Sequence, residues 1–548
     1  MRLLTSYSLL LFFLFSCETK RELSQKESFR FNILTGLTSL DPAFASNKPK
    51  WWLTRQLYNG LLSVDDKLEL CPSIAKAWHV SPDMKSYTFT IRKGVYFHDS
   101  PAFSLGKGRE VKAQDAAYSL HRILKTGTGA WIMNDKLLRD SKGEIAAQAI
   151  QALNDTTLQI TLQQGCPFFL HILTMPYCYV VPQEAVNYYG DTFREHPVGT
   201  GAFRFVSWHE DNKLILAKNE HYWRASPQHS VPKLDYIEVS FIADANQEFR
   251  FFMNKKLDLV SNIQEGTRDE LFQIGGKLND KFKEKLSVVR SPYLITDYLG
   301  FQLDINAACY KGKKDHPYLD VYVRKALNAA IDKDALVNYY YAGLALPATD
   351  GMIPRGIKGY QSKVKQSQTK AMDYLKKSRF YGKMGEYALS LQCNATSKAV
   401  AEFLQKQWEQ TLGISISIDI CDGGTLNSMA NAGKSAFFYA GWIADYPDPE
   451  NFMALFYSPY FKPKGPNKMH FKNEVVDSLF YIAGIKTDNN SRYEDYAKID
   501  SIAMEEQAVI PLFHEESLWL CQKNIDNIQN NPSALLKLEN VSISKAIK

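Results

Sequence analysis

Residues 387–420 form a strand–helix–strand pattern that restricts the fold of this chain more than any other feature. Two short apolar segments, YALSLQC and ISISIDI, flank SKAVAEFLQKQWEQTLG. The apolar spacing of the middle segment and its final glycine predict a helix. A helix between two apolar strands indicates a parallel pair, because parallel strands need a long crossover connection. The pattern therefore predicts a mixed α/β fold.

The length of 548 residues indicates two or three domains, because a single hydrophobic core stops growing well below that size. The character of the sequence changes near residues 290–300. After this point, YVRKALNAAIDKDALVNYYY predicts one long helix over 322–341. Before it, AFRFVSWHEDNKLILAKN reads as two strands around a polar tip and predicts a hairpin. We therefore expect a seam between two parts of the fold near residues 290–300.

The N-terminus has the pattern of an export signal. Arg2 precedes an apolar run from about Leu9 to Phe15, which is too short to span a bilayer. The run ends in Ser16 and Cys17, and this ending resembles the lipobox of bacterial lipoproteins, whose cysteine becomes the acylated first residue. The resemblance implies a signal peptide over 1–16, lipidation of Cys17 and a tether over 17–27. The alternative is a plain secretory signal with an incidental cysteine.

Charge and cysteine usage narrow the possible functions. The net charge of +6 is spread along the chain without a Lys/Arg block, so we expect no nucleic-acid partner.

Cys17 is one of eight cysteines, and the remaining seven leave at least one free thiol in an exported chain. Cys166 and Cys178 flank a short apolar segment and could form a disulfide. No histidine falls at zinc-finger spacing, so we expect no structural metal.

Enzyme motifs occur only in fragments. Ser73 to Lys76 matches S-x-x-K, and Lys125 to Gly127 matches K-T-G, but the two are too close together for the enzymes that use them. Gly199 to Gly201 leads into a strand, so we interpret it as a turn and not as a phosphate loop. Neither H-E-x-x-H nor G-x-S-x-G is present. We therefore expect no catalytic residues and no cofactor.

Four segments carry a family resemblance. They are LYNGLLSVDDKLELCPSIAKAWHVSPDMKSYTFTIRKGVYFHD, PVGTGAFRFVSWHEDNKLILAKNEHYW, VRKALNAAIDKDALV and GWIADYPDPENF. Their order resembles that of the extracytoplasmic solute-binding proteins of the peptide ABC-transporter class. This class is solute-binding protein family 5, which includes the oligopeptide- and dipeptide-binding proteins. The resemblance extends over about residues 29–520.

The resemblance implies an α/β, two-lobed periplasmic-binding-protein-like fold of type II, with an extra α+β domain on the first lobe. The first lobe is discontinuous in this family, which predicts residues 28–60, 187–296 and 522–548 for it here. The extra domain would occupy residues 61–186. The second lobe would occupy residues 297–521.

The segment GWIADYPDPENF is the main candidate for the ligand site. In the peptide-binding relatives, an aspartate at the position of Asp445 holds the α-ammonium group of the ligand. Gly441, Trp442 and Tyr446 are further candidates for ligand contact, and a place in the core is the alternative for Trp442. A carboxylate at a strand end can make a charge-assisted bond to an ammonium group without reading side chains. The alternative is that Asp445 caps the following turn. Asp448, between two prolines, is expected to be structural.

The opposite wall of the cleft is expected around residues 46–50. The resemblance implies that backbone groups of Ser46, Asn47 and Lys48 pair with a peptide main chain like an added strand. Lys48 or Lys50 could meet a ligand carboxylate, although a lysine exposed to solvent is the alternative. Arg355 is a further basic candidate on the second lobe.

The sequence therefore predicts a monomeric, lipid-anchored receptor that faces the periplasm or cell exterior. It would bind a peptide between two hinged lobes and deliver it to ABC permease subunits. No ATPase motif is present, so a separate subunit would supply the energy. Two alternatives remain at this point: a binding protein for a sugar, metal chelate or other amine-bearing solute, and a cell-surface hydrolase on a similar scaffold.

Overall fold

The structure is a computed structural model, and it describes residues 27–34, 36–126, 133–210, 212–273, 275–365, 369–462 and 465–544. The predicted signal peptide and Cys17 lie outside the described residues. Within the described residues, no helix has both the length and the apolar character needed to cross a membrane.

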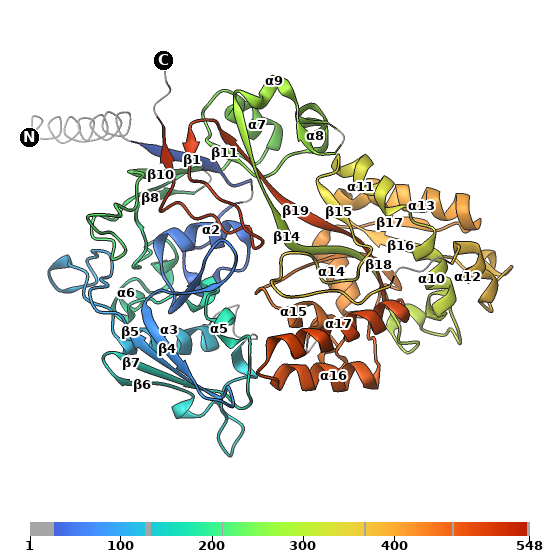
Figure 1. Cartoon of the computed structure of the whole chain (residues 1–548), viewed down its shortest axis with the longest axis horizontal. Coiled ribbons are helices and arrows are strands. Elements are labelled where there is room, and N and C mark those ends of the chain that lie inside the picture. Colours follow the sequence, from blue (N-terminus) through green and yellow to red (C-terminus); the bar gives the residue numbers. More distant parts are fainter. Residues whose placement is uncertain are drawn as a thin grey trace, which may run out of the picture.

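One eleven-stranded sheet runs through both lobes, in the order β17-β16-β18-β14-β19-β11-β1-β10-β9-β8, with β15 on β19 (Figure 1). The strands on the first lobe are β1 (Ser28–Asn32), β8 (Phe203–His209), β9 (Lys213–Lys218), β10 (Tyr236–Ser240) and β11 (Leu259–Val260). The strands on the second lobe are β15 (Ala345–Pro347), β16 (Ser390–Cys393), β17 (Ser417–Ile420) and β18 (Phe437–Ile443). The predicted hairpin is confirmed, because β8 and β9 pair antiparallel.

Two long antiparallel strands, β14 (Leu286–Phe301) and β19 (Val509–Gln522), connect the lobes. Figure 1 shows them crossing from the part beside α7 and α9 to the part that contains β16 and β18. Their register shifts between Pro292 and Thr296, which bends the pair where it passes between the lobes. The expected seam near residues 290–300 falls in β14. The residue-by-residue lobe and domain boundaries stay a prediction.

The strand–helix–strand prediction is confirmed. β16 and β17 are parallel, and α13 (Lys398–Leu412) connects them. Gly413 ends the helix in the left-handed conformation, with φ of 66°, a position that glycine occupies without steric cost. Trp408 is fully buried and anchors the helix on the sheet.

The prediction of one long helix over 322–341 is wrong. The segment forms two helices, α10 (Val321–Ala329) and α11 (Lys333–Tyr341). Between them Asp332 has an extended backbone, and its side chain accepts a hydrogen bond from the Ala335 N–H at 2.9 Å. Aspartate is a preferred N-cap because it satisfies such an unpaired donor, so this residue starts a new helix.

The region predicted as the extra domain contains a separate four-stranded antiparallel sheet, ordered β4-β5-β7-β6. Its strands are β4 (Ala75–Val80), β5 (Ser86–Ile91), β6 (Ile150–Asn154) and β7 (Thr157–Thr161). The described residues of the same region also form the helices α3 (Ala113–Thr126) and α5 (Phe169–Ile172). This sheet lies at the lower left of Figure 1, and its hydrophobic core is continuous with that of the first lobe.

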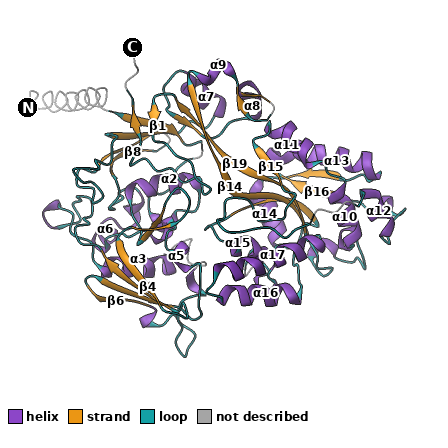
Figure 2. Ribbon diagram, viewed as in Figure 1, coloured by secondary structure: helices purple, strands orange, loops and turns teal. Residues whose placement is uncertain are grey.

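The second lobe has a core on each face of its sheet, because successive strand residues point to opposite faces. Leu299, Phe301 and Phe437 belong to one core. Tyr298 and Phe438 belong to the other. Helices cover both faces of this part of the sheet (Figure 2).

The remaining elements complete the two lobes. The other helices are α2 (Lys48–Leu57), α6 (Gln183–Tyr189), α7 (Ala245–Met253), α8 (Glu265–Leu271), α9 (Asp280–Lys283), α12 (Ala371–Lys377), α14 (Gly423–Asn431), α15 (Glu450–Met453), α16 (Glu474–Ile485) and α17 (Asn489–Glu505). The short strand pairs are β2 (Leu62–Val64) with β3 (Leu70–Pro72), β12 (Phe272–Gln273) with β13 (Lys277–Leu278), and β20 (Ile525–Asp526) with β21 (Ser542–Ile543).

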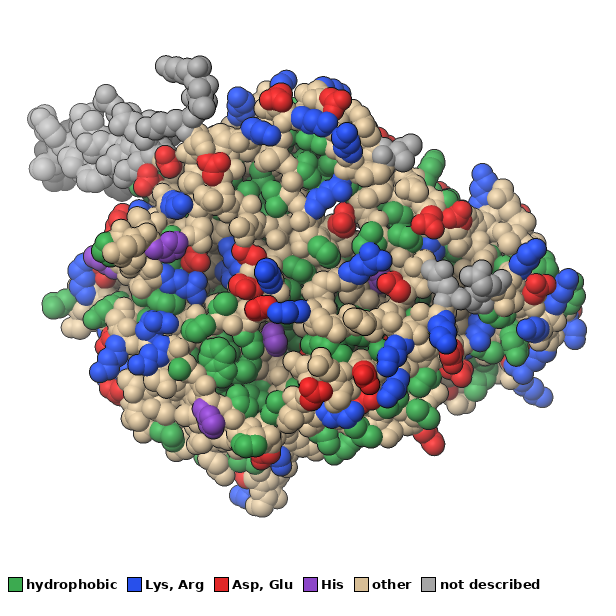
Figure 3. Space-filling view, viewed as in Figure 1, with side chains coloured by type: hydrophobic (Ala, Val, Ile, Leu, Met, Phe, Trp, Pro, Cys, Tyr) green, Lys and Arg blue, Asp and Glu red, His purple; other side chains and the backbone are tan. Residues whose placement is uncertain are grey.

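The possible Cys166–Cys178 disulfide is not formed, and both residues are buried free thiols. Cys178 donates instead to the carbonyl oxygen of Ile172, at 3.4 Å. On the face shown in Figure 3, basic and acidic side chains are interspersed.

Candidate functional site

Asp445 lies where β18 ends, and the asparagine of the same motif holds this turn. The backbone N–H of Ala444 still donates to Leu294 on β14, at 2.9 Å. The next N–H, that of Asp445, donates to the side-chain oxygen of Asn451, at 3.3 Å. The indole Nε1 of Trp442 donates to the same oxygen, at 3.1 Å. Asn451 is buried and therefore fixes both the strand end and the Asp445 backbone.

The side chain of Asp445 is half-buried, and within the described residues it forms no ion pair. It lines a small cavity of about 40 Å³ together with residues of the first lobe, among them Trp51, Arg55 and Thr174. Burial raises the pKa of its carboxyl group to about 6, although a hydrogen bond with Asn451 partly offsets this effect.

Asp448 has the structural role expected of it. Its carboxylate accepts from the Glu450 N–H at 3.0 Å and from the Arg492 guanidinium with both oxygens, also at 3.0 Å. The side chains of this ion pair are 3% and 1% exposed for Asp448 and Arg492. The two aspartates of the motif therefore differ, because one has its counter-ion inside the protein and the other does not.

Tyr446 is packed between the lobes. Its ring stacks on Phe168 of the four-stranded-sheet region, with centroids 5.2 Å apart and planes 6° from parallel. Its hydroxyl donates to the Glu450 carboxylate. The pKa of Glu450 is raised to about 7, and burial is the main cause. Tyr446 is 6% exposed, so the structure places it in an inter-lobe contact and not on a cavity wall.

Gly441 lines a larger cavity of about 490 Å³ that extends along β18 from Phe438 to Gly441. Its other lining residues are Arg268, Asp297, Tyr341, Asn394, Thr396, Ser397, Gly423, Leu426, Asn427, Ala430, Phe438, Tyr439, Ala440, Lys468 and Glu515. This volume lies within the ordinary range for small-molecule sites, about 300–1,000 Å³. Trp442 is half-buried beside the core of the second lobe and lines neither this cavity nor the one at Asp445.

The predicted opposite wall is the N-terminus of α2. Ser46 and Asn47 are exposed, and the Asn47 side chain caps the helix by accepting from the Lys50 N–H at 3.2 Å. The Lys50 ammonium donates to the carbonyl oxygen of Phe44, at 3.2 Å, and so binds the loop that precedes α2.

Lys48 faces the second lobe. Its ammonium lies 4.9 Å from the centroid of the Trp52 ring. Desolvation lowers its pKa to about 8, against an opposing effect of Glu515 on β19. Arg355, the other predicted basic candidate, is exposed and lines neither cavity.

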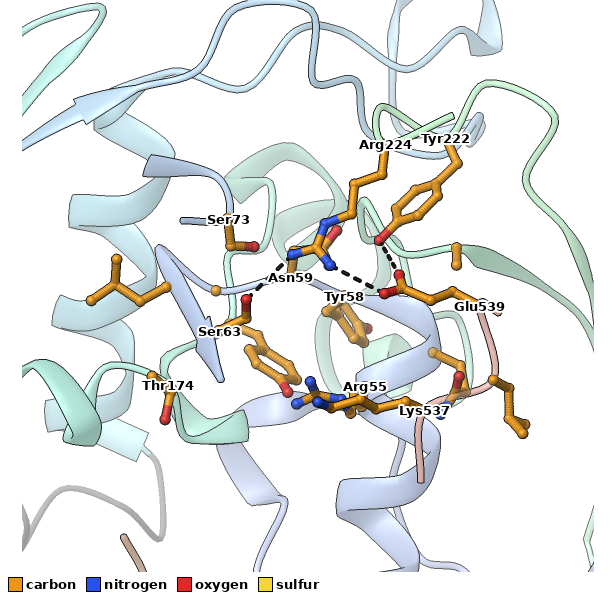
Figure 4. A pocket seen from close by; sticks show the side chains of 16 residues that line it. Arg55, Tyr58, Asn59, Ser63, Ser73, Thr174, Tyr222, Arg224, Lys537 and Glu539 are labelled. Carbon is orange, nitrogen blue, oxygen red and sulfur yellow. Dashed lines mark hydrogen bonds and ion pairs between the residues drawn. The ribbon is translucent and has the colours of Figure 1, made fainter. Parts of the chain in front are cut away.

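Another pocket lies on the first lobe and has a structural character (Figure 4). Glu539 accepts from Tyr222 at 2.8 Å and from Arg224 at 3.1 Å, and Lys537 forms an ion pair with Asp66 at 2.7 Å. Arg224 also donates to Ser63, at 3.3 Å. Its volume of about 40 Å³ is enough for an ordered water.

Several residues of the candidate site could not be found from motif spacing. Asn451 lies inside the quoted motif, but only the folded turn shows that its side chain reaches back to Asp445. Asp297, Lys468 and Glu515 come from separate parts of the chain and line one cavity only in the folded protein. No group of three or more metal-ligating side chains occurs in the part of the chain that the structure describes.

The sequence profile of the bacterial extracellular solute-binding proteins, family 5 Middle, matches residues 69–463. The periplasmic oligopeptide-binding protein OppA of Salmonella typhimurium is 26% identical over 516 residues, covering 90% of this chain and 88% of OppA. The glutathione-binding protein GsiB of Escherichia coli is 27% identical over 529 residues, with 93% of each chain covered. The dipeptide-binding protein DppE of Bacillus subtilis is 23% identical over 529 residues, covering 92% of this chain and 89% of DppE.

Solved structures agree on the fold. The periplasmic binding protein DppA of Helicobacter pylori, in complex with the peptide STSA, superposes with a TM-score of 0.75 at 22% identity, covering 96% of this chain and 100% of DppA. The murein tripeptide-binding protein MppA of Escherichia coli gives 0.74 at 21% identity, covering 95% of this chain and 99% of MppA. With a profile match over most of its length, the chain belongs to the bacterial extracellular solute-binding proteins of family 5.

Proposed function

We propose that this protein binds peptides between its two lobes and holds their α-ammonium group with Asp445. The observation that carries the proposal is a carboxyl group that is largely desolvated, lines a cavity and forms no ion pair within the described ranges, although the side chain of Arg55 lines the same cavity. A buried charge without a partner is unfavourable, and a ligand ammonium group provides one. The names of the relatives, which bind dipeptides, oligopeptides or glutathione, support the same chemistry.

The remainder of the ligand would occupy the 490 Å³ cavity along β18. Lys468 is a candidate for the ligand carboxylate at that end. Its ammonium donates to the neutral side chain of Asn427 at 2.7 Å, and desolvation lowers its pKa to about 8. An ammonium group without a carboxylate partner is an electrostatic match for the second terminus of a peptide.

Lobe closure would follow from ligand binding. A peptide that contacts both lobes stabilises the closed arrangement, in which Tyr446 stacks on Phe168. The closed form would then be recognised by the permease subunits of an ABC importer. Acylation at Cys17 would keep the protein, as a monomer, at the membrane surface facing the periplasm or cell exterior.

Calorimetric titration tests the proposal with a pair of ligands. Ligand-free protein is titrated with trialanine and with N-acetyl-trialanine, which lacks the ammonium group. We expect saturable binding of trialanine, without hydrolysis, and at least tenfold weaker binding of the acetylated peptide. Equal affinity for the two would refute the role of Asp445, and binding of neither would refute peptide recognition of this kind.

A further inference from the structure

A pair of carboxyl groups from the two connecting strands lies in the larger cavity. Asp297 on β14 and Glu515 on β19 both line it. Asp297 is 8% exposed, and its Oδ1 accepts from the Tyr439 hydroxyl at 2.9 Å. Its other oxygen, Oδ2, is buried and has no hydrogen-bond partner. A buried carboxyl group with an unsatisfied oxygen is unfavourable. Asp297 Oδ2 is therefore an acceptor that a ligand in the cavity could use.

Within the described ranges, neither Asp297 nor Glu515 forms an ion pair with a basic side chain. Lys48 and Arg268 interact with Glu515 electrostatically, but neither forms an ion pair with it. The guanidinium of Arg268 instead donates to two backbone carbonyl oxygens, those of Tyr340 and Ile263. Burial, and then repulsion by Glu515, raises the pKa of Asp297 well above its ordinary range. Burial also raises the pKa of Glu515, and a hydrogen bond that it shares with Asp297 opposes this effect.

Gly441 keeps the carboxyl pair open to the cavity. It is the residue opposite Asp297 in the pairing of β14 with β18. A Cβ atom at this position would stand 3.5 Å from Asp297 Oδ1. A side chain at this position would therefore pack against the Asp297 carboxyl group, whereas glycine leaves the space beside it open along the strand where the ligand is proposed to lie.

We propose that Asp297 and Glu515 together bind a cationic side chain of the ligand, so that the protein prefers peptides with a lysine or arginine after the first residue. The inference rests on the proposed function, because it assumes a peptide with its ammonium group at Asp445. The Cα atoms of Gly441 and Asp445 are at most about 14 Å apart, the span of four extended residues. The basic residue is therefore expected at the second, third or fourth position.

The test uses tetrapeptides that differ only in side-chain charge. Calorimetry compares tetra-alanine variants carrying lysine at position two, three or four with the same peptides carrying norleucine, which has a similar chain but no ammonium group. In the wild type we expect one lysine peptide to bind at least tenfold more tightly than its norleucine counterpart. In Asp297→Asn and in Glu515→Gln, this ratio is expected to fall to threefold or less.

The control variant is Asp419→Asn, which removes an exposed carboxylate from β17 on the same lobe and should keep the full ratio. Thermal unfolding checks the fold of each variant. Asp297→Asn should melt at or above the wild-type temperature at pH 7.5, because it removes a desolvated carboxyl group.

The outcomes separate the two proposals. If the peptides bind but lysine gives no advantage at any position, the carboxyl-pair inference is wrong and peptide binding stands. The same conclusion follows if the lysine preference survives in both folded variants. If no tetrapeptide binds, the proposed function fails, and the inference fails with it.

Discussion

Replacing Asp445 by asparagine should have opposite effects on ligand affinity and on the stability of the empty protein. Asparagine keeps the size and one acceptor oxygen of the side chain but removes its charge. The ligand ammonium group then loses its counter-ion, whereas the empty site no longer contains a desolvated carboxylate. Weaker binding of a peptide without basic side chains, together with greater stability of the empty protein, identifies this group.

The magnitude follows from the environment of Asp445. The difference between its pKa of about 6 and the ordinary value of 3.8 corresponds to about 3 kcal/mol of unfavourable free energy for the ionised form. Because the pKa is raised by folding, this cost appears as the pH rises from about 4 to 6 and is fully present at pH 7. Asp445→Asn should therefore stabilise the empty protein by up to about 3 kcal/mol at pH 7.5, and by less at pH 5.

Calorimetry and urea unfolding measure the two effects on the same samples. The hydrogen bond of a charged pair contributes about 1.5–3 kcal/mol, so trialanine should bind Asp445→Asn about 10- to 150-fold more weakly than it binds the wild type. The N-acetylated peptide, which has no ammonium group, should bind both proteins alike. Wild-type affinity for trialanine in Asp445→Asn, within twofold, would show that Asp445 is not the ammonium site.

Three further predictions concern pH, the motif turn and the anchor. Trialanine affinity should fall about tenfold between pH 7.5 and pH 5, because Asp445, with a pKa of about 6, must lose its proton before it can bind an ammonium group, and a pH-independent affinity in calorimetry would contradict this. Arg492→Met should lower the free energy of urea unfolding by about 3–5 kcal/mol, because it leaves Asp448 buried and unpaired. The matched Arg379→Met breaks an exposed pair with Asp315 and should change stability by less than about 1 kcal/mol; equal losses in the two variants would refute the buried role. Cys17→Ser should move the exported protein from the detergent phase to the aqueous phase in Triton X-114 partition, and a wild-type protein without acyl mass at Cys17 would refute the anchor.

The elements predicted from sequence are those whose pattern is local. The strand–helix–strand unit around α13 was predictable because its apolar period and its glycine stop act within a few residues of each other. The break between α10 and α11 was missed because alanine-rich helical spacing outweighed a single capping residue, Asp332. The free Cys166 and Cys178 show that closeness in sequence does not bring two thiols into bonding geometry.

The candidate site was predictable only in part, for a physical reason. Asp445 could be singled out because a carboxylate directly after an apolar strand needs a partner, and the family resemblance indicated which partner. The separate roles of Tyr446 and Trp442 depend on what the other lobe and the turn place against them. The pairing of Asp297 with Glu515 depends on the register of β14 and β19, which no local pattern encodes.

The central claim is that the cleft captures peptides through their α-ammonium group. The most direct measurement incubates the ligand-free protein with a mixed pool of di- to hexapeptides, half of them N-acetylated, and identifies the retained molecules by native mass spectrometry. The account predicts retained, intact peptides that almost all carry a free amino terminus. Equal retention of acetylated and free peptides, or retention of none, would contradict it.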